Sequence, residues 1–244
     1  MKCLILAGGF GTRLYPSIVN TAKALINFNG KSVITHIIER VPDYIDILVS
    51  INKYFEADFL KWQEELTRQV EICVEESLTD KQKKGATSAI DYWIKSKYIS
   101  EDLLVIAADN YFEFDLVDMI SSFDGNNVLV ALHDFGDLSR VCEKGQPCQY
   151  GLAILDSNRI IRFDEKPAAI ISSIVATGIY VLPRRIFSLL SLYCNNAKQD
   201  NLGSFISYLV EKDSVFGYCF KNLWLDIGDD IINAERRPVT EKMQ

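Results

Sequence analysis

The chain has 244 residues, of which 48% are hydrophobic and 24% are charged, and its formal net charge is −7. This length and composition predict one sizeable α/β domain that can bury a full core. The acidic balance argues against a nonspecific nucleic-acid binder, which relies on a broad basic surface, but a few cations in one cleft can still hold a nucleotide. The only histidines are His36 and His133, which are almost too few for a histidine zinc site or a Ser-His-Asp triad.

The sequence also predicts a soluble, cytoplasmic protein with no membrane partner. No stretch approaches about 18 consecutive apolar residues, and the amino terminus lacks the layout of a signal peptide. The six cysteines are scattered without a C-x-x-C pair, which favours buried reduced thiols over disulfides. Cys142 and Cys148 flank a polar loop and are the one pair for which oxidation is considered.

The first predicted element is a short strand over residues 2–6 that runs directly into a glycine-rich turn. Glycine lets a ligand approach backbone amides without meeting a Cβ atom, and the cations Arg13 and Lys23 follow the turn. The pattern therefore predicts a loop that grips a polyphosphate. A P-loop needs Lys and then Ser or Thr after its last glycine, and a dinucleotide fingerprint needs a glycine where Leu14 stands, so neither fits. The alternative is a plain strand-turn-helix connection whose glycines only permit a tight bend.

The rest of the first half alternates helices and strands. A loop over residues 17–30 and a polar loop over residues 75–84 are expected, and Lys81, Lys83 and Lys84 in the second are read, by a slight preference, as solvated surface residues. Apolar spacing predicts helices over residues 31–41, 54–70 and 85–98, and strands over residues 45–51 and 71–74.

A nearly unbroken apolar run over residues 103–108 predicts a central parallel strand covered on both faces. Asp109 follows it directly, at the sheet edge where open α/β folds bind ligands. A carboxylate at this position is a strong candidate metal ligand. The weaker alternative is a cap for a helix over residues 115–122.

The second half has a mixed pattern. A hairpin over residues 150–155 and 159–164 turns at residues 156–158. The remaining predicted elements are strands over residues 128–133, 174–182, 215–220 and 224–227, and helices over residues 184–193, 202–212 and 229–235. The fold class is therefore α/β: a doubly wound, mostly parallel, Rossmann-like central sheet in residues 1–125, completed within a single domain by a mixed α+β half in residues 126–244.

The string LAGGFGTRLYP at residues 6–16, with Lys23 seven residues after its proline, resembles the signature of the sugar-1-phosphate nucleotidyltransferases. This family includes glucose-1-phosphate thymidylyltransferase. Shorter likenesses follow in order along nearly the whole chain: Tyr150-Gly151, Glu165-Lys166-Pro167, residues 177–180 and residues 224–228.

The resemblance implies a role for each matching residue. Arg13 and Lys23 would be catalytic, with Arg13 on the triphosphate and departing pyrophosphate and Lys23 on the α-phosphate. Asp109 and Asp226 would hold Mg²⁺, the expected cofactor. Nucleotide contacts would come from Leu6, Ala7, Gly8, Gly9, Gly11, Thr12, Arg13, Lys23, Gly85, Ala86 and Asp109. Sugar 1-phosphate contacts would come from Gly151, Glu165, Lys166, Ala176 and Thr177. The alternatives are a solvated pair for Glu165 and Lys166 and a turn residue for Asp226.

The implied reaction joins an NTP and a sugar 1-phosphate into an NDP-sugar and pyrophosphate. Transfer from dTTP or UTP to glucose 1-phosphate is expected first. Guanylyl or cytidylyl transfer to mannose, heptose or another sugar 1-phosphate stays open, as does a non-catalytic subunit that senses NDP-sugar. The chain ends in a charged segment over residues 236–244, and no carboxyl-terminal β-helix domain is expected. A homo-oligomer is possible.

Overall fold

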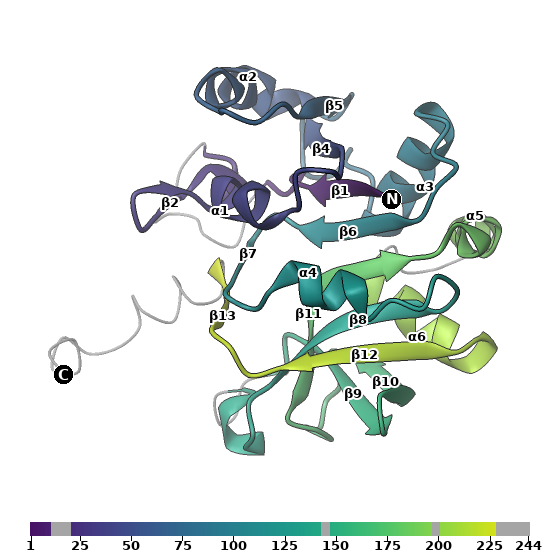
Figure 1. Ribbon diagram of the computed structural model, residues 1–244. Helices are drawn as coiled ribbons and strands as arrows, with labels where there is room; N and C mark the ends of the chain where they lie inside the picture. The colour runs from purple at the N-terminus through teal and green to yellow at the C-terminus, as the bar shows by residue number, and fades with distance from the viewer. Residues whose placement is uncertain (11–20, 143–146, 197–200, 228–244) are drawn as a thin grey trace, which may run out of the picture.

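The computed structural model describes residues 1–10, 21–142, 147–196 and 201–227 (Figure 1). Its centre is a nine-stranded sheet with the strand order β5-β4-β1-β6-β11-β8-β12-β10-β9. These strands are β1 (Lys2–Leu6), β4 (Ile47–Asn52), β5 (Glu71–Glu75), β6 (Leu103–Ala107), β8 (Val128–Asp134), β9 (Gly151–Asp156), β10 (Arg159–Glu165), β11 (Ile174–Leu182) and β12 (Val215–Phe220).

Helices cover both faces of this sheet. The buried residues of α1 (Val33–Arg40), α2 (Glu56–Glu64) and α4 (Leu116–Ser121) belong to one hydrophobic cluster. Those of α3 (Ala86–Ser96), α5 (Phe187–Asn196) and α6 (Leu202–Lys212) belong to the other. Short 3-10 turns complete the described helices: η2 (Lys23–Leu25), η3 (Lys53–Phe55), η4 (Leu138–Arg140) and η5 (Arg184–Ile186). The predicted α/β fold class is therefore correct.

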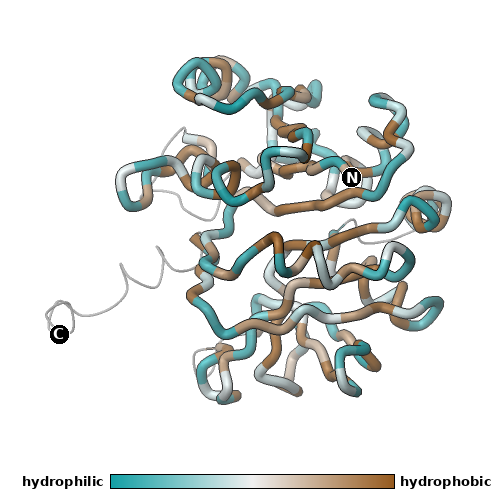
Figure 2. The backbone as a smooth tube through the Cα atoms, viewed as in Figure 1, coloured by the Kyte–Doolittle hydropathy of each residue, from teal (hydrophilic) through white to brown (hydrophobic). Residues whose placement is uncertain are grey.

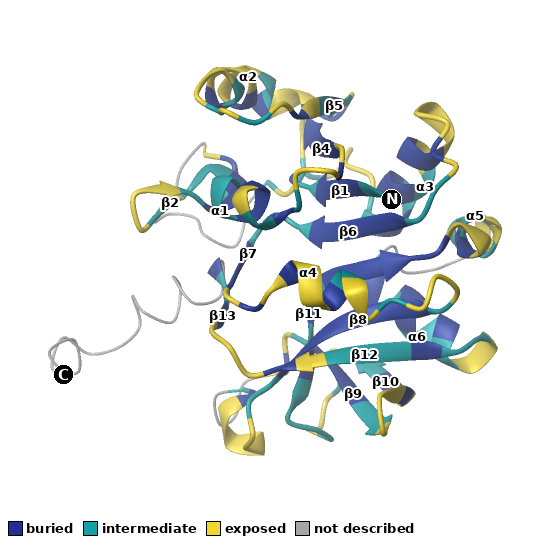
Figure 3. Cartoon of the chain, viewed as in Figure 1, coloured by how far each residue is buried: buried dark blue, intermediate teal, exposed yellow. Residues whose placement is uncertain are grey.

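Strand β6 explains why its sequence is an unbroken apolar run. Leu104 and Ile106 point into the first cluster, whereas Leu103 and Val105 point into the second, and all four are completely buried. Successive side chains of a strand face opposite sides of the sheet, so a central strand with helices on both faces needs apolar residues at every position. Figures 2 and 3 show this apolar, buried centre.

The sheet is mixed: it is parallel throughout its first half, and β12 pairs in parallel with β8 in the second half. β1 pairs in parallel with β4 and β6, and β4 pairs in parallel with β5. β11 then runs antiparallel between β6 and β8, and the hairpin of β9 and β10 is antiparallel as well. The four strands that residues 1–125 contribute to this sheet are parallel, as predicted. The mixed directions lie in the second half, where an apolar run does not encode the direction in which its strand enters the sheet.

Two small sheets were missed. β7 (Asn110–Phe112) pairs antiparallel with β13 (Trp224–Asp226), and β2 (Asn27–Phe28) pairs with β3 (Lys31–Ser32). The predicted loop over residues 17–30 is therefore wrong in its described part, and the helix predicted from residue 31 begins at Val33 because two residues belong to β3. The helix predicted over residues 54–70 ends at Glu64. The helix predicted over residues 229–235 lies outside the described residues.

All six cysteines are free thiols, and three of them are buried. Across the described ranges, no helix combines the length and the apolar character that crossing a bilayer requires.

Candidate active site

A cavity of about 310 Å³ opens beside the carboxyl ends of β1 and β6. Its walls bring together eight of the residues predicted to contact the nucleotide, and they are Leu6, Ala7, Gly8, Gly9, Lys23, Gly85, Ala86 and Asp109. Gly11, Thr12 and Arg13 lie outside the described residues. Segments that are distant in sequence therefore meet where the sequence predicted a nucleotide site.

The start of the glycine turn is held by the neighbouring strands. The amide of Ala7 donates to the Ser50 carbonyl over 2.7 Å, and the Asn52 side chain donates to the Gly8 carbonyl over 3.3 Å. Neither Gly8 nor Gly9 has a positive φ. A Cβ atom at Gly8 would meet protein atoms only at 4.0 Å, and one at Gly9 would meet none within 4 Å among the described residues. Because no described residue requires glycine at either position, the open space that these residues leave beside the backbone is compatible with the ligand-gripping interpretation.

Lys23 lies between two aspartates at the edge of this cavity. Its Nζ atom donates to Asp109 Oδ2 over 2.7 Å and to Asp226 Oδ1 over 3.2 Å. The three side chains are partly buried, with exposed fractions of 19%, 34% and 25% for Lys23, Asp109 and Asp226. Burial opposes the charge on Lys23, but the two carboxylates outweigh burial and raise the pKa of its ammonium group. Lys23 is therefore charged at neutral pH.

The backbone places the two aspartates together. Asp109 follows β6 directly, and Asp226 is the last residue of β13, where it pairs with Asn110 of β7. The Ile227 amide donates to the Asp109 carbonyl over 2.9 Å and closes this ladder. The missed pairing of β7 with β13 is thus the element that brings the second carboxylate to the first.

The donor set suits a hard divalent cation. Both carboxylates already converge on one positive charge, the Lys23 ammonium group. Mg²⁺ is commonly held by one or two carboxylates together with substrate phosphates and water. No group of three or more histidine, cysteine, aspartate or glutamate side chains that could hold a metal occurs in the part of the chain that the structure describes. Asp109 and Asp226 would therefore suit an ion that takes its remaining ligands from a substrate.

The sequence profile of the nucleotidyl transferase family matches residues 2–237. The chain belongs to this family. The likeness to sugar-1-phosphate nucleotidyltransferases predicted from the residues is thereby confirmed.

Relatives of the chain carry several names. The bifunctional protein GlmU of Methanocaldococcus jannaschii is 28% identical, over 97% of this chain and 54% of the relative. The mannose-1-phosphate guanyltransferase of Pichia angusta is 25% identical, over 93% of this chain and 61% of the relative. The chain thus spans 54% to 61% of the length of these two relatives.

A solved structure from Bacillus anthracis, of a protein assigned as a glucose-1-phosphate thymidylyltransferase, matches with a TM-score of 0.77. The sequences are 23% identical, and the match covers 98% of this chain and 96% of the other. At this identity the comparison shows a common fold.

In the mixed half of the sheet, the Glu165 side chain lies between two glycines. A Cβ atom on Gly151 would stand 3.0 Å from Glu165 Oε2, and one on Gly203 would stand 1.8 Å from it. Burial raises the pKa of Glu165, although the neighbouring Lys166 opposes the effect. Lys166 itself is exposed, with a φ of 46°. The solvated-pair alternative therefore fits Lys166 but not Glu165.

Gly203 was missed by the sequence analysis. It lies in the first turn of α6, where glycine is a poor helix former, and that mismatch was the available signal. Its neighbour Leu202 lines the 310 Å³ cavity, so α6 connects the Glu165 region with the nucleotide side. The predicted sugar-phosphate residues do not line that cavity themselves.

The Thr177 side chain is buried and bonded within the sheet. Its hydroxyl group donates to the Ala131 carbonyl of β8 over 3.0 Å, and only 2% of the residue is exposed. The side chain therefore stabilises the pairing of β11 with β8. Ala176 is half-buried and pairs with Leu132.

Lys83 and Lys84 line the cavity although both are exposed. Lys83 pairs with Asp80 over 2.6 Å, and the Lys84 ammonium group lies 4.7 Å from the centre of the Tyr92 ring. The interpretation of these lysines as solvated surface residues therefore holds. The structure adds that Lys83 and Lys84 lie at the cavity.

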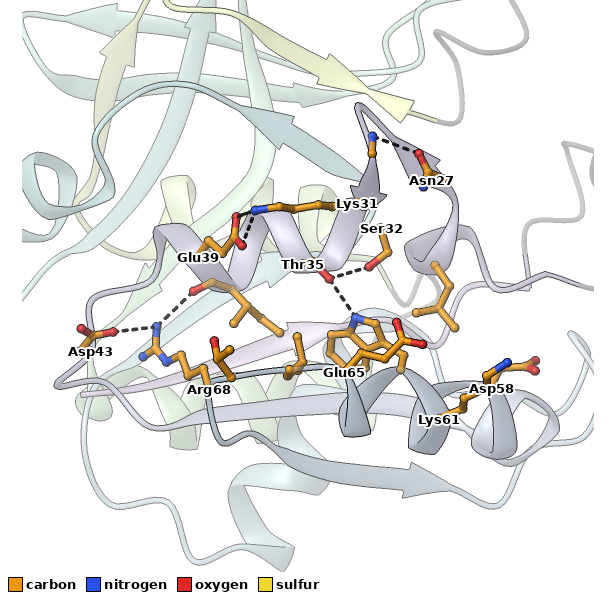
Figure 4. A pocket seen from close by; sticks show the side chains of 16 residues that line it. Asn27, Lys31, Ser32, Thr35, Glu39, Asp43, Asp58, Lys61, Glu65 and Arg68 are labelled. Carbon is orange, nitrogen blue, oxygen red and sulfur yellow. Dashed lines mark hydrogen bonds and ion pairs between the residues drawn. The ribbon is translucent and has the colours of Figure 1, made fainter.

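A larger groove of about 700 Å³ lies between α1 and α2 (Figure 4). The Trp62 indole donates to Thr35 Oγ1 over 2.9 Å, and Lys31 pairs with Glu39 over 2.6 Å. Arg68 donates to carbonyls at the end of α1, including that of Pro42 over 2.7 Å. None of the predicted site residues lines this groove, so the smaller cavity is the candidate active site despite its size.

Proposed function

We propose that the protein is a sugar-1-phosphate nucleotidyltransferase, which makes an NDP-sugar and pyrophosphate from an NTP and a sugar 1-phosphate. The observation that carries this proposal is the cluster of Lys23, Asp109 and Asp226 at a glycine-lined cavity. Phosphoryl chemistry needs this combination of groups: a cation beside two carboxylates, next to open backbone amides. A subunit that only sensed NDP-sugar would not require the whole set.

The chemistry needs no protein nucleophile. A sugar phosphate is already an anionic oxygen nucleophile near neutral pH, and the barrier lies in bringing two anions together in line. Catalysis therefore depends on positioning and on positive charge around the α-phosphorus. Lys23 would turn from the carboxylates to the α-phosphate, and Arg13 would bind the triphosphate and the departing pyrophosphate. Mg²⁺ held by Asp109 and Asp226 would supply further positive charge beside the phosphates.

On the sugar side, Glu165 would accept hydrogen bonds from sugar hydroxyl groups. Its side chain is half-buried between Gly151 and Gly203, which suits an acceptor that must meet a polar ligand there. The Gly151 backbone and the segment of Ala176 and Thr177 would complete the sugar pocket, and Lys166 would bind the sugar phosphate.

For the substrate pair we propose dTTP or UTP with glucose 1-phosphate. The names of the relatives favour the alternative of guanylyl transfer to mannose 1-phosphate strongly enough for both to be tested together. Cytidylyl transfer and heptose phosphates belong to the same test. Neither nucleic acid nor a membrane is a proposed partner, and a homo-oligomer is compatible with the proposal.

The test is pyrophosphate release with Mg²⁺, in which dTTP, UTP, GTP, CTP and ATP are each combined with glucose, mannose, galactose and N-acetylglucosamine 1-phosphates. Release that requires both substrates would support the transferase proposal, and the best pair would identify the base and the sugar. Binding of an NDP-sugar without release from any pair would instead support a sensing subunit.

A further inference from the structure

Asn110 links the two strands that carry the aspartates. It is the first residue of β7 and is 3% exposed. Its Oδ1 atom accepts a hydrogen bond of 2.7 Å from the Trp224 indole, and its Nδ2 atom donates to the Ala107 carbonyl over 3.0 Å. One side chain thus joins the end of β6 to the beginning of β13.

The surrounding chain is shaped to hold this amide. Gly178 in β11 has a φ of 80°, and a Cβ atom there would stand 3.1 Å from Asn110 Nδ2 and 3.1 Å from Ala107 Cβ. The pairing of β11 with β8 is irregular between Ala176 and Tyr180, which includes this glycine. A side chain at Gly178 would press on the amide, so the backbone leaves room for Asn110 at the cost of regular strand pairing.

The two aspartates depend on this link. Asp109 precedes Asn110 directly, and Asp226 is its partner in the ladder of β7 and β13. We propose that Asn110 and Trp224 are positioning residues that hold Asp226 against Asp109 and Lys23. Neither residue would touch the substrate. The proposal rests on the proposed function and adds to it the device that sets the spacing of the two carboxylates.

The variant Trp224→Phe tests this link because it keeps a ring and removes the indole donor. Loss of a residue that orients a metal ligand typically costs about 10- to 100-fold in metal affinity or activity. We expect a fall of that size in kcat/KM and a higher Mg²⁺ concentration at half-maximal rate. Hydrogen exchange of the Ile227 amide, which donates to the Asp109 carbonyl, should become faster.

Trp62→Phe is the matched control. It also removes an indole hydrogen bond, of 2.9 Å to Thr35 Oγ1, but between α1 and α2. We expect wild-type kcat/KM, Mg²⁺ requirement and Ile227 exchange in this variant.

An unchanged Mg²⁺ requirement in Trp224→Phe would overturn the proposal, even if its rate fell, because the loss would then have another origin. Unchanged Ile227 exchange would do the same. Should the variant fail to fold, the wild-type protein decides the question: its Trp224 indole hydrogen must exchange as slowly as the Ile227 amide, and faster exchange would refute the link. Absence of pyrophosphate release by the wild type would refute the proposed function instead, while both exchange measurements would still test the link.

Discussion

Replacing Lys23 with methionine should expose the repulsion between Asp109 and Asp226. Their oxygens lie 2.7 and 3.2 Å from the Lys23 ammonium nitrogen, so they are close to one another as well. Two like charges about 6 Å apart repel by about 3 kcal/mol at an effective dielectric constant of about 20. Because water reaches both carboxylates, we discount this to a loss of about 1 to 2 kcal/mol in the free energy of unfolding. For a chain of this length that corresponds to roughly 2 to 8 °C in melting temperature.

The assay is thermal unfolding with and without Mg²⁺, together with pyrophosphate release. In Lys23→Met, Mg²⁺ no longer competes with an ammonium group for the carboxylates, so it should raise the melting temperature more than in the wild type. The rate should fall by about 10²- to 10³-fold, as for the loss of one charge-stabilising contact. Lys31→Met is the matched control because it removes an ion pair with Glu39 in which both side chains are 50% exposed. It should shift stability by less than about 1 kcal/mol and leave the rate unchanged.

The pKa of Lys23 also predicts how the difference in stability between wild type and Lys23→Met depends on pH. The folded pKa of Lys23 is raised above its ordinary value of 10.5, so the stability that its charge contributes is fully present below that pH. This stability is lost only as the pH rises through the folded value. The difference in stability between wild type and Lys23→Met should therefore be constant through the neutral range.

An equal effect of Mg²⁺ on the melting temperatures of wild type and Lys23→Met would refute the assignment of the two carboxylates as a cation site.

Three further changes have definite outcomes. Asp226→Asn should purify folded and lose about 10²- to 10³-fold in turnover, and a folded variant with the wild-type rate, measured by pyrophosphate release, would contradict the metal assignment. Burial raises the pKa of Glu165 above 4.5, so its ionisation costs stability as the pH rises through the folded value. Glu165→Gln should therefore remove that part of the pH dependence of melting and raise the KM for the sugar 1-phosphate; unchanged melting curves across the acidic range would show that the carboxylate is not desolvated. Gly203→Ala would place a Cβ atom 1.8 Å from Glu165 Oε2, the end of a flexible side chain, so that the carboxylate must turn aside. Its KM for the sugar 1-phosphate should rise while its melting temperature changes little, and an unchanged KM would refute the role of Glu165.

Much of the fold could be predicted because its elements carry their own periodic or continuous apolar patterns. β11 and β12 have the predicted bounds, and α6 does as well. In β11 the buried residues alternate up to Ile179 and then continue to Leu182, and in α6 they recur at helical spacing, which the sequence displays directly. The antiparallel direction of β11 was not predictable in this way, since its alternating burial is the same in either direction.

The candidate site was predictable in its members but not in its assembly. Lys23, Asp109 and Asp226 were selected individually, and the structure brings their charged atoms together. β13 was predicted as a strand over residues 224–227, but the three residues of β7 are too few for any periodicity to be visible, so the pairing of the two strands was missed. For Thr177, the sequence resemblance implied a place beside the sugar. It could not reveal that the Thr177 hydroxyl group donates to the Ala131 carbonyl.

The short ladder of β7 and β13 also accounts for the choice of aspartate in this cluster. Asp109 and Asp226 have short side chains on backbone that is held by the Ile227 amide and by strand pairing. Few rotatable bonds then separate each carboxylate from fixed atoms, so little conformational entropy is lost when a cation binds. A longer glutamate would reach the same cation from a less ordered position. Because the backbone sets the carboxylates, a change that loosens the ladder should weaken the cation site even though it leaves every charge in the cluster in place.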